Sequence, residues 1–564
     1  MLPSSASSSA EARAPAHEVV VATNGTGDLS FTDVYRAHGE ILTALEVFND
    51  TVGQRAGERL QVLMRLDENS RALQASLCQQ YLNNPAALNQ AENTLWNRIF
   101  SLYWQLKRGY RALIREHNAN SGDRQTKSNL ALITVRALHY SAASFKWGYF
   151  RHMPVDPKIW QSLHRLYRTS ERGGFTSQRI RLYDHTEHTS CSEEYIRILL
   201  LDLLSPLSLV PTQIEIADQW LRRRVKSVRL DDTYASDKHL FYVDLAESAG
   251  ARKVDSNLKG DKLRFLAMDE LLGRIDDIIA GSGDLASLSR LNVVEDWQQV
   301  MNLELASPVR AQWSSMSTMR PHPREAVQRT QKLFQHFRTH WSGVAYKRQH
   351  SREDLRQIVE VACDLPAICR TLMSAAAQGR TDGNQDTPAS EELMALPEYW
   401  TVQNRSEVGY GFCASAEAQG RIRVGGLVGL RDGNPAGGWE IGAIRRIAHA
   451  SLDEIAVGVE TLTRAPKLVQ LCGMGRLVLA GGKEHASTGG QEIHAVTAIL
   501  LSGIDDSTTA GRLILPIADY PTRIIDLRDG DCSFRIRLAT VLERTENWIL
   551  VEFDVVNTSD REES

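Results

Sequence analysis

The chain has 564 residues, too many for one hydrophobic core, so at least three folded units are expected. A formal net charge of −4 excludes a general DNA- or RNA-binding protein, for which a strongly basic chain is typical. Any anionic ligand must therefore be held by a local cluster of cations. The seven cysteines form an odd set without a CxxC pair, which indicates reduced thiols in the cytosol.

Residues 1–30 are rich in Ser and Ala and predict a disordered lead, without the basic and apolar regions of a secretion signal. The most apolar stretch, residues 196–210, is too short to span a bilayer and contains Asp202 and Pro206. We therefore expect a cytoplasmic protein without a membrane span. Recruitment to a cell pole or to a membrane complex is compatible with this expectation.

Residues 31–340 predict a helical domain, because apolar residues recur at three-and-four spacing, as in residues 95–114. Ser190 and Glu193 have the spacing of a capping box ahead of an apolar run, which predicts a helix start there. Residues 239–254 interrupt the helical pattern and are expected to hold one or two strands.

Aromatic side chains gather on one predicted helix of this domain, at Trp96, Phe100, Tyr103 and Trp104. A core-facing stripe is the simplest interpretation, and an exposed part of it could dock another protein. Protein partners are therefore expected to bind through the helical half.

From residue 341 the pattern changes to short β-type runs divided by Gly, Asn and Asp. We expect an antiparallel β-barrel over 341–465 with an inserted helix and loop at 364–393, a further small β domain over 466–558, and a tail at 559–564. The sequence Asp529-Gly530-Asp531 predicts a tight turn between two strands. No internal repeat is recognisable. The expected fold class is α+β multidomain, a helical bundle followed by β domains.

Two arginines with RxxxR spacing, Arg348 and Arg352, lie directly before the first β-type run. The same spacing occurs at five other places in the chain, and for most of these pairs a solvated helix face is the better explanation. This pair differs in its context, since the β half begins immediately after it. It is either an anion-binding pair or a charged linker.

A second motif, NRSEVGYGF at 404–412, contains Asn404, Ser406 and Gly409 between two strand-like runs. Short polar side chains there can bond to a ligand edge, and the glycine permits positive φ or the close approach of a ligand. A simple turn between strands is the alternative. The pattern Asx-x-Ser-x-x-Gly has one near match, at Asp505, Ser507 and Ala510.

The order of RxxxR, a β run, NxSxxG and the later run Val457-Gly458-Val459 resembles the PilZ domain, the bacterial receptor module for cyclic di-GMP. The resemblance covers residues 346–462 and implies a PilZ-type antiparallel barrel. It implies that Arg348 and Arg352 hold guanine and phosphate, while Asn404, Ser406 and Gly409 line the other side of the nucleotide. Further candidates are Lys347, Arg405, Arg445 and Arg446, and the alternative for the last three is that they are exposed strand arginines. The helical half joined to such a unit resembles the long proteobacterial receptors of the FimW type.

The chemistry of the ligand agrees with this resemblance. Guanine presents O6 and N7 as paired acceptors, which a planar guanidinium can contact together at about 1–3 kcal/mol per contact. A few such contacts approach the roughly −8 kcal/mol of micromolar binding. Lys347 stands where some members have a third arginine, which leaves open whether one nucleotide or a stacked pair binds. Asn404 replaces the commoner aspartate.

The sequence therefore predicts a cyclic di-GMP receptor that signals by changing its domain arrangement and protein contacts, in pilus, motility or biofilm control. A PilZ-like adaptor that no longer binds nucleotide is the alternative. A hydrolase within 466–558 has little support, because no nucleophile and base can be paired. The cluster at 184–191 with two histidines is interpreted as a polar loop rather than a metal site. No catalytic residues, metal or cofactor are expected.

Overall fold

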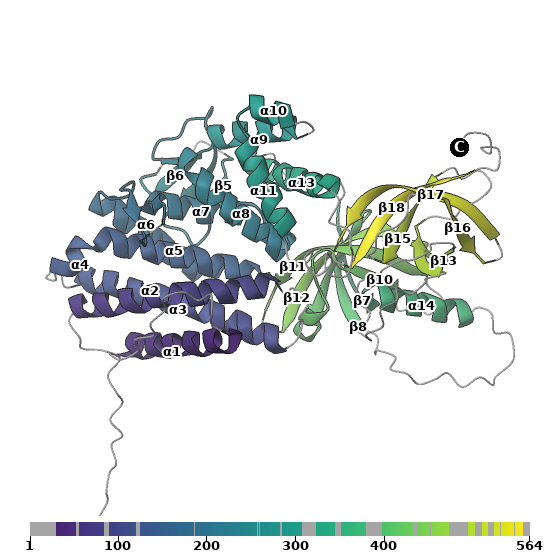
Figure 1. The fold of residues 1–564 in the computed structure, drawn as a ribbon, viewed down its shortest axis with the longest axis horizontal. Coiled ribbons are helices and arrows are strands. Elements are labelled where there is room, and N and C mark those ends of the chain that lie inside the picture. Colours follow the sequence, from purple (N-terminus) through teal and green to yellow (C-terminus); the bar gives the residue numbers. More distant parts are fainter. Residues whose placement is uncertain are drawn as a thin grey trace, which may run out of the picture. The chain divides into compact units, whose positions relative to one another are not determined.

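The computed structural model describes residues 30–51, 56–83, 90–119, 124–184, 186–255, 258, 260–282, 285–306, 323–343, 351–378, 398–432, 438–451, 453–472, 495–501, 510–516, 524–530, 532–545 and 547–556. They confirm the α+β multidomain class, with a helical N-terminal half followed by antiparallel β-barrels (Figure 1). No helix within these ranges is both long and apolar enough to cross a membrane.

The N-terminal half is built mainly of helices. Its longest members carry apolar residues on the face that is buried, as the spacing in the sequence predicts. The helices are α1 (Phe31–Asp50), α2 (Ala56–Asn83), α3 (Gln90–Ala119), α4 (Arg124–Ser128), α5 (Leu130–Tyr149), α6 (Pro157–Gly173), α7 (Cys191–Leu203), α8 (Pro211–Arg224), α9 (Asp269–Gly281), α10 (Leu285–Arg290), α11 (Val294–Ala306) and α13 (Pro323–Trp341), with short 3-10 turns at Pro206–Ser208 and Val225–Ser227.

Local sequence signals set several helix ends. Helix α6 begins after Asp156, whose side chain accepts a hydrogen bond from the Lys158 amide, and ends at Gly174 with φ of +69°. The predicted helix start is confirmed, since the Glu193 amide donates to Ser190 Oγ at 3.2 Å ahead of α7. These signals are short-range, so they can be recognised without knowledge of the fold.

Two small sheets interrupt the helices. Strands β1 (Ile180–Arg181) and β2 (His188–Thr189) form one pair, and β3 (Arg229–Asp231), β4 (His239–Asp244), β5 (Arg252–Lys253) and β6 (Leu263–Ala267) form a sheet of order β3-β6-β4-β5. The expectation of strands within 239–254 is confirmed by β4 and β5.

The first barrel is closed and entirely antiparallel. Its interior is filled by alternate residues such as Trp400, Val402 and Phe412, as period-two strands require. A helix, α14 (Leu365–Gln378), follows its first strand. The strands are β7 (Glu353–Cys363), β8 (Glu398–Ser406), β9 (Gly409–Ser415), β10 (Leu427–Asp432), β11 (Trp439–His449) and β12 (Glu454–Thr463), with a 3-10 turn at Ala416–Gly420.

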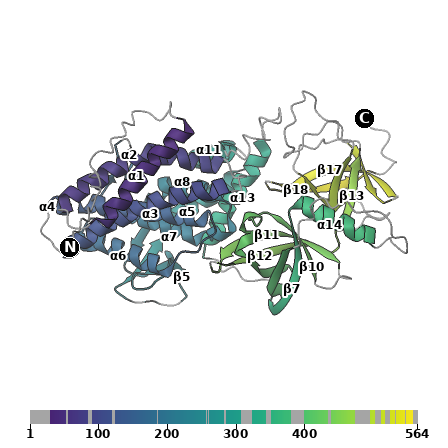
Figure 2. The same cartoon turned by 90° about the horizontal axis from the view of Figure 1, so that it is seen from below.

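A second closed barrel follows directly, with its own apolar core. Gly530, with φ of +61°, lies in the tight turn between β16 and β17, as the sequence predicts. Helix α14 packs against β7 and β10 of the first barrel and against β13 of the second (Figure 2). The strands are β13 (Lys467–Cys472), β14 (Ala495–Leu500), β15 (Ala510–Pro516), β16 (Ile524–Asp529), β17 (Cys532–Arg544) and β18 (Trp548–Val555).

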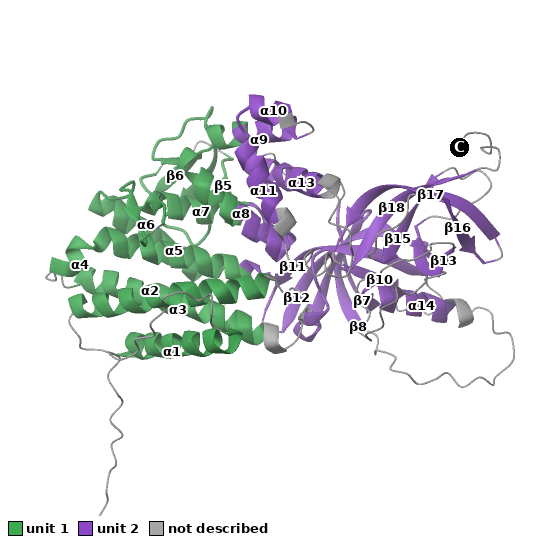
Figure 3. Cartoon of the chain, viewed as in Figure 1, with its two compact units in different colours: residues 1–148, 155–203, 218–273 green, residues 149–154, 204–217, 274–564 purple. Residues whose placement is uncertain are grey.

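The chain divides into two compact units (Figure 3). One contains residues 1–148, 155–203 and 218–273, and the other contains residues 149–154, 204–217 and 274–564. Both barrels therefore belong to a single unit. The domain limits expected from the sequence stay predictions.

Candidate functional site

Arg352, the last residue before β7, contacts the second sequence motif. Its Nη1 donates to Asn404 Oδ1 at 3.0 Å, across the β7–β8 pairing in which Asp354 faces Asn404. Arg352 is exposed, so the guanidinium retains donors that face solvent. The two motifs, separated by 52 positions, thus meet at one edge of the first barrel.

A β-bulge in β8 turns Asn404 away from the barrel interior. Trp400 and Val402 are buried, and strict alternation would bury position 404 as well. The register shifts between Val402 and Asn404, so that Gln403 is the extra residue. A Cβ atom on Gly411 would lie 2.7 Å from Asn404 Oδ1, so the amide covers the outer face of β9.

A second bulge, in β11, exposes two arginines in succession. Ile444 and Ile447 both point into the core, although they are three positions apart. The register shift between Ile444 and Arg446 makes Arg445 the extra residue, so Arg445 and Arg446 both lie off the core. The two bulges flank the same stretch of sheet.

Two glycines form the floor between the bulges. Asn404 pairs with Gly411, Gly411 with Gly458, and Gly458 with Arg446, which makes one row across β8, β9, β12 and β11. Neighbouring strands lie about 4.8 Å apart, so Asn404 and Arg446 are roughly 14 Å apart along the row. Neither glycine carries a side chain. The Asn404 amide lies over Gly411, whereas the backbone at Gly458 stays open to a planar ring.

Gly409 does not have the positive φ that the sequence allowed for, and its lack of a side chain serves the packing of the strands. Its φ is not positive, and a Cβ atom there would lie 2.1 Å from the carbonyl oxygen of Val459. Ser406 Oγ donates to the Gly409 carbonyl at 3.1 Å. The glycine therefore allows the backbones of β9 and β12 to approach each other, and the serine braces the turn between β8 and β9.

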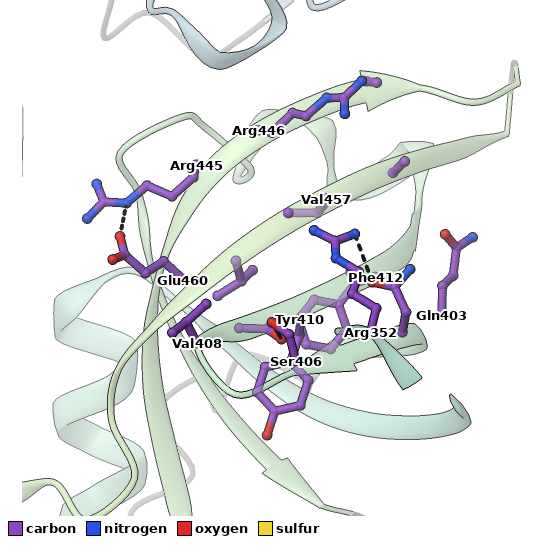
Figure 4. A pocket seen from close by; sticks show the side chains of 17 residues that line it. Arg352, Gln403, Ser406, Val408, Tyr410, Phe412, Arg445, Arg446, Val457 and Glu460 are labelled. Atoms are coloured by element: carbon purple, nitrogen blue, oxygen red, sulfur yellow. Dashed lines mark hydrogen bonds and ion pairs between the residues drawn. The ribbon is translucent and has the colours of Figure 1, made fainter. Parts of the chain in front are cut away.

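These residues surround a pocket of about 550 Å³ (Figure 4). Its charged lining consists of three arginines and one glutamate, so the surplus is cationic. In the close-up, Arg445 points toward Glu460. The lining residues are Arg352, Gln403, Asn404, Ser406, Val408, Gly409, Tyr410, Gly411, Phe412, Arg445, Arg446, Ala448, Ala456, Val457, Gly458, Val459 and Glu460.

Tyr410 contributes a neutral donor at one edge of the pocket. Its hydroxyl donates to Glu440 Oε2 at 3.0 Å. Burial, followed by the charge of Glu440, raises the pKa of Tyr410 to about 12. The phenol therefore stays protonated at neutral pH, and its hydrogen bond holds the Glu440 carboxylate beside Tyr410.

Four of the predicted site residues, Arg352, Asn404, Ser406 and Gly409, and the further candidates Arg445 and Arg446 line this one pocket. Arg405 does not belong to the lining, and its guanidinium lies 5.4 Å from the centre of the Tyr410 ring. Lys347 and Arg348 lie outside the described residues.

Sequence reasoning missed Gly411, Tyr410 and Glu460. The GYG of the second motif and the VGV run carried a signal for the two floor glycines, since glycine inside a strand pattern indicates a bulge or a close approach. Glu460 is two residues after Gly458 and has no signal of its own.

Within the described ranges, no group of three or more His, Cys, Asp or Glu side chains is arranged to hold a metal ion. The fold and the pocket together define an α+β multidomain protein whose first barrel carries an arginine-lined recess suited to a small polar anion.

Comparison with known families gives one match, in the N-terminal part of the chain. Residues 23–235 match the family described as "Cyclic-di-GMP receptor FimW, N-terminal domain". The N-terminal part of the chain is therefore similar to the N-terminal domain of that receptor family. No curated protein matches the chain.

Proposed function

We propose that this protein is a bacterial receptor for cyclic di-GMP, which binds in the pocket of the first barrel. The description of the matched family supports cyclic di-GMP as the ligand, because it names a cyclic-di-GMP receptor. The resemblance of residues 346–462 to a PilZ domain supports the location. We assign no catalytic residue, metal or cofactor to the protein. In this proposal the protein acts by binding the nucleotide.

The contact between Arg352 and Asn404 at the end of the glycine floor is the observation that carries the proposal. A guanine ring can lie on the backbone at Gly458 while its edge meets the Asn404 amide and its O6 and N7 meet a guanidinium. Arg446 lies at the opposite end of the row, where it can meet a phosphate. In the proposed complex Arg348 joins Arg352 in holding guanine and phosphate.

The proposed signal starts at the arginine pair. Because the segment that carries it connects the helical half to the first barrel, a contact between ligand and these arginines would shift the populations of domain arrangements. A protein partner of the helical half would read this shift, in the cytoplasm or at a cell pole or membrane complex. Pilus, motility and biofilm control are the processes that the FimW resemblance implies.

Isothermal titration of cyclic di-GMP into the full chain tests the proposal. Wild type should bind, and Arg352→Ala should weaken binding by about 10- to 100-fold, because one charge-assisted contact of roughly 1.5–3 kcal/mol is lost. The double variant Arg348→Ala/Arg352→Ala should abolish measurable heat. Arg356→Ala is the matched control, since Arg356 is an exposed arginine on β7 outside the pocket lining.

If folded wild type gave no heat, the alternative function, a PilZ-like adaptor that does not bind nucleotide, would be the better one. Equal affinity of wild type and the double variant would place the ligand elsewhere. A comparable loss in Arg356→Ala would mean that general charge, rather than the pocket, attracts the nucleotide.

A further inference from the structure

The second barrel repeats the strand order of the first. When the strands of each barrel are numbered one to six along the chain, both follow the order 1-2-3-6-5-4 around the barrel, and every pair is antiparallel. The second copy begins four residues after β12 ends. The unit thus consists of two like barrels in tandem.

The two barrels share an apolar interface. Leu427 and Ile441 of the first barrel belong to the same buried cluster as Ile514 and Trp548 of the second. Trp548 Nε1 also donates to the carbonyl oxygen of Gly425, at 2.8 Å. The contact is therefore a packed one, and any polar group placed at its border is held in a defined position.

Arg445, one of the pocket arginines, is bound at this border by the second barrel. Its Nη1 and Nη2 donate to Glu543 Oε1 and Oε2 of β17 at 2.5 and 2.8 Å, which is a bidentate pair. Its Nε donates to Glu460 Oε2 at 2.6 Å, the contact drawn in Figure 4. The exposed fractions of the three side chains are 37% for Arg445, 26% for Glu543 and 51% for Glu460.

This arrangement opposes an anionic ligand. Two carboxylates occupy one guanidinium, so the rim of the pocket carries a net negative charge where Arg445 would otherwise offer a positive one. Burial alone would lower the pKa of Arg445, but the hydrogen bonds and charges of Glu543 and then Glu460 raise it. Arg445 therefore stays positively charged, and only the anionic group that it binds can change.

We propose that Glu543 is a regulatory residue of the nucleotide pocket: it holds Arg445 against the second barrel, and the phosphate of a bound dinucleotide competes for the same guanidinium. This inference rests on the proposed function of the pocket. The Arg445 bulge gives the side chain access to either partner, since it lies between the pocket and β17. Linkage makes the effect reciprocal: if ligand binding loosens the Glu543 contact, then loosening that contact favours ligand binding.

Titration of cyclic di-GMP into full-length Glu543→Gln tests the inference. The amide keeps the size of the side chain but removes the competing charge, so we expect binding about 3- to 10-fold tighter than wild type. Glu552→Gln is the matched control, since Glu552 is a β18 glutamate paired with Arg512 in the second barrel, and its affinity should equal that of wild type. In an Arg445→Ala background, Glu543→Gln should have no further effect.

A second measurement follows the interface itself. Hydrogen exchange of wild type should increase in the β17 segment around Glu543 when cyclic di-GMP is added. Unchanged exchange there, or Glu543→Gln affinity equal to or weaker than wild type, would overturn the inference while leaving the proposed function standing. Tighter binding that persists in Arg445→Ala would overturn it too, because the effect would not pass through Arg445. Absence of heat with wild type would instead overturn the proposed function, and the inference with it.

Discussion

At the scale of single residues, the pocket depends on positions where a side chain is missing. Gly409 lets β9 and β12 approach each other, Gly411 makes room for the Asn404 amide, and Gly458 leaves the backbone of β12 uncovered. Gly409 is the most constrained, because the obstacle is the backbone of β12 rather than a movable side chain.

Gly409→Ala should therefore destabilise the first barrel. The added methyl group would lie 2.1 Å from the Val459 carbonyl oxygen, and relieving that overlap requires β9 and β12 to separate. We expect the free energy of unfolding of the barrel to fall by about 1–3 kcal/mol, with weaker ligand binding as a consequence. Chemical denaturation followed by tryptophan fluorescence measures the change.

Gly420→Ala is the control for this variant, since a Cβ atom at that exposed position of the same barrel meets nothing within 4 Å. Its stability should stay within about 0.5 kcal/mol of wild type. If Gly409→Ala were as stable as Gly420→Ala, the close approach of β9 and β12 would not constrain this glycine.

At the scale of elements, the helical half holds a buried polar cluster that joins several helices. Asp67 of α2 accepts hydrogen bonds from the hydroxyls of Tyr110 at 2.5 Å, of Tyr140, and of Tyr183 at 3.1 Å, and it pairs with Arg136 of α5 at 3.2 Å. Burial raises the pKa of Asp67, while Arg136 and the three tyrosines counteract that rise. The cluster fixes how α2, α3 and α5 meet.

Asp67→Asn should disrupt this cluster, because the amide nitrogen would point a donor at groups that are themselves donors and leave the Arg136 charge without its buried partner. We expect the unfolding free energy of the helical part to fall by about 3–5 kcal/mol. Thermal and denaturant unfolding followed by circular dichroism at the helical band measures it.

The neighbouring residue supplies the control. Glu68 contacts the same arginine at 3.3 Å but is 53% exposed, so Glu68→Gln should cost at most about 1 kcal/mol. If the two variants lost equal free energy of unfolding, the burial of Asp67 would not determine its contribution to stability.

Elements whose signals are local could be predicted from the sequence. The helix start at Ser190 and the turn at Gly530 each depend on a few adjacent residues, and both are confirmed. The bulges at Gln403 and Arg445 could not be predicted, since a bulge is defined by the register with a partner strand. For the same reason strict alternation would have buried Asn404, although the motif itself pointed to the pocket.

At the scale of the whole molecule, the repetition of the barrel could not be recognised in the sequence, because strand order depends on pairing between distant residues. Asp505, Ser507 and Ala510 are a near match to the pocket motif, and Ala510 opens β15 as Gly409 opens β9. That correspondence is visible only once the strands are placed. The contact of Arg445 with Glu543 spans 98 positions and had no sequence signal.

The shared apolar interface predicts that the two barrels lose stability together. Trp548 is almost fully buried between them and bonds to Gly425 of the first barrel, so Trp548→Ala removes packing from both sides and should cost about 3–5 kcal/mol. Hydrogen exchange should then rise in β10 and β11 as well as in β15 and β18.

Ile525→Ala provides the comparison, because Ile525 lies in the core of the second barrel alone and its replacement should raise exchange only there. If Trp548→Ala raised exchange in the second barrel and left β10 and β11 unchanged, the barrels would be independent folding units, and a competition for Arg445 would have no packed interface through which to act.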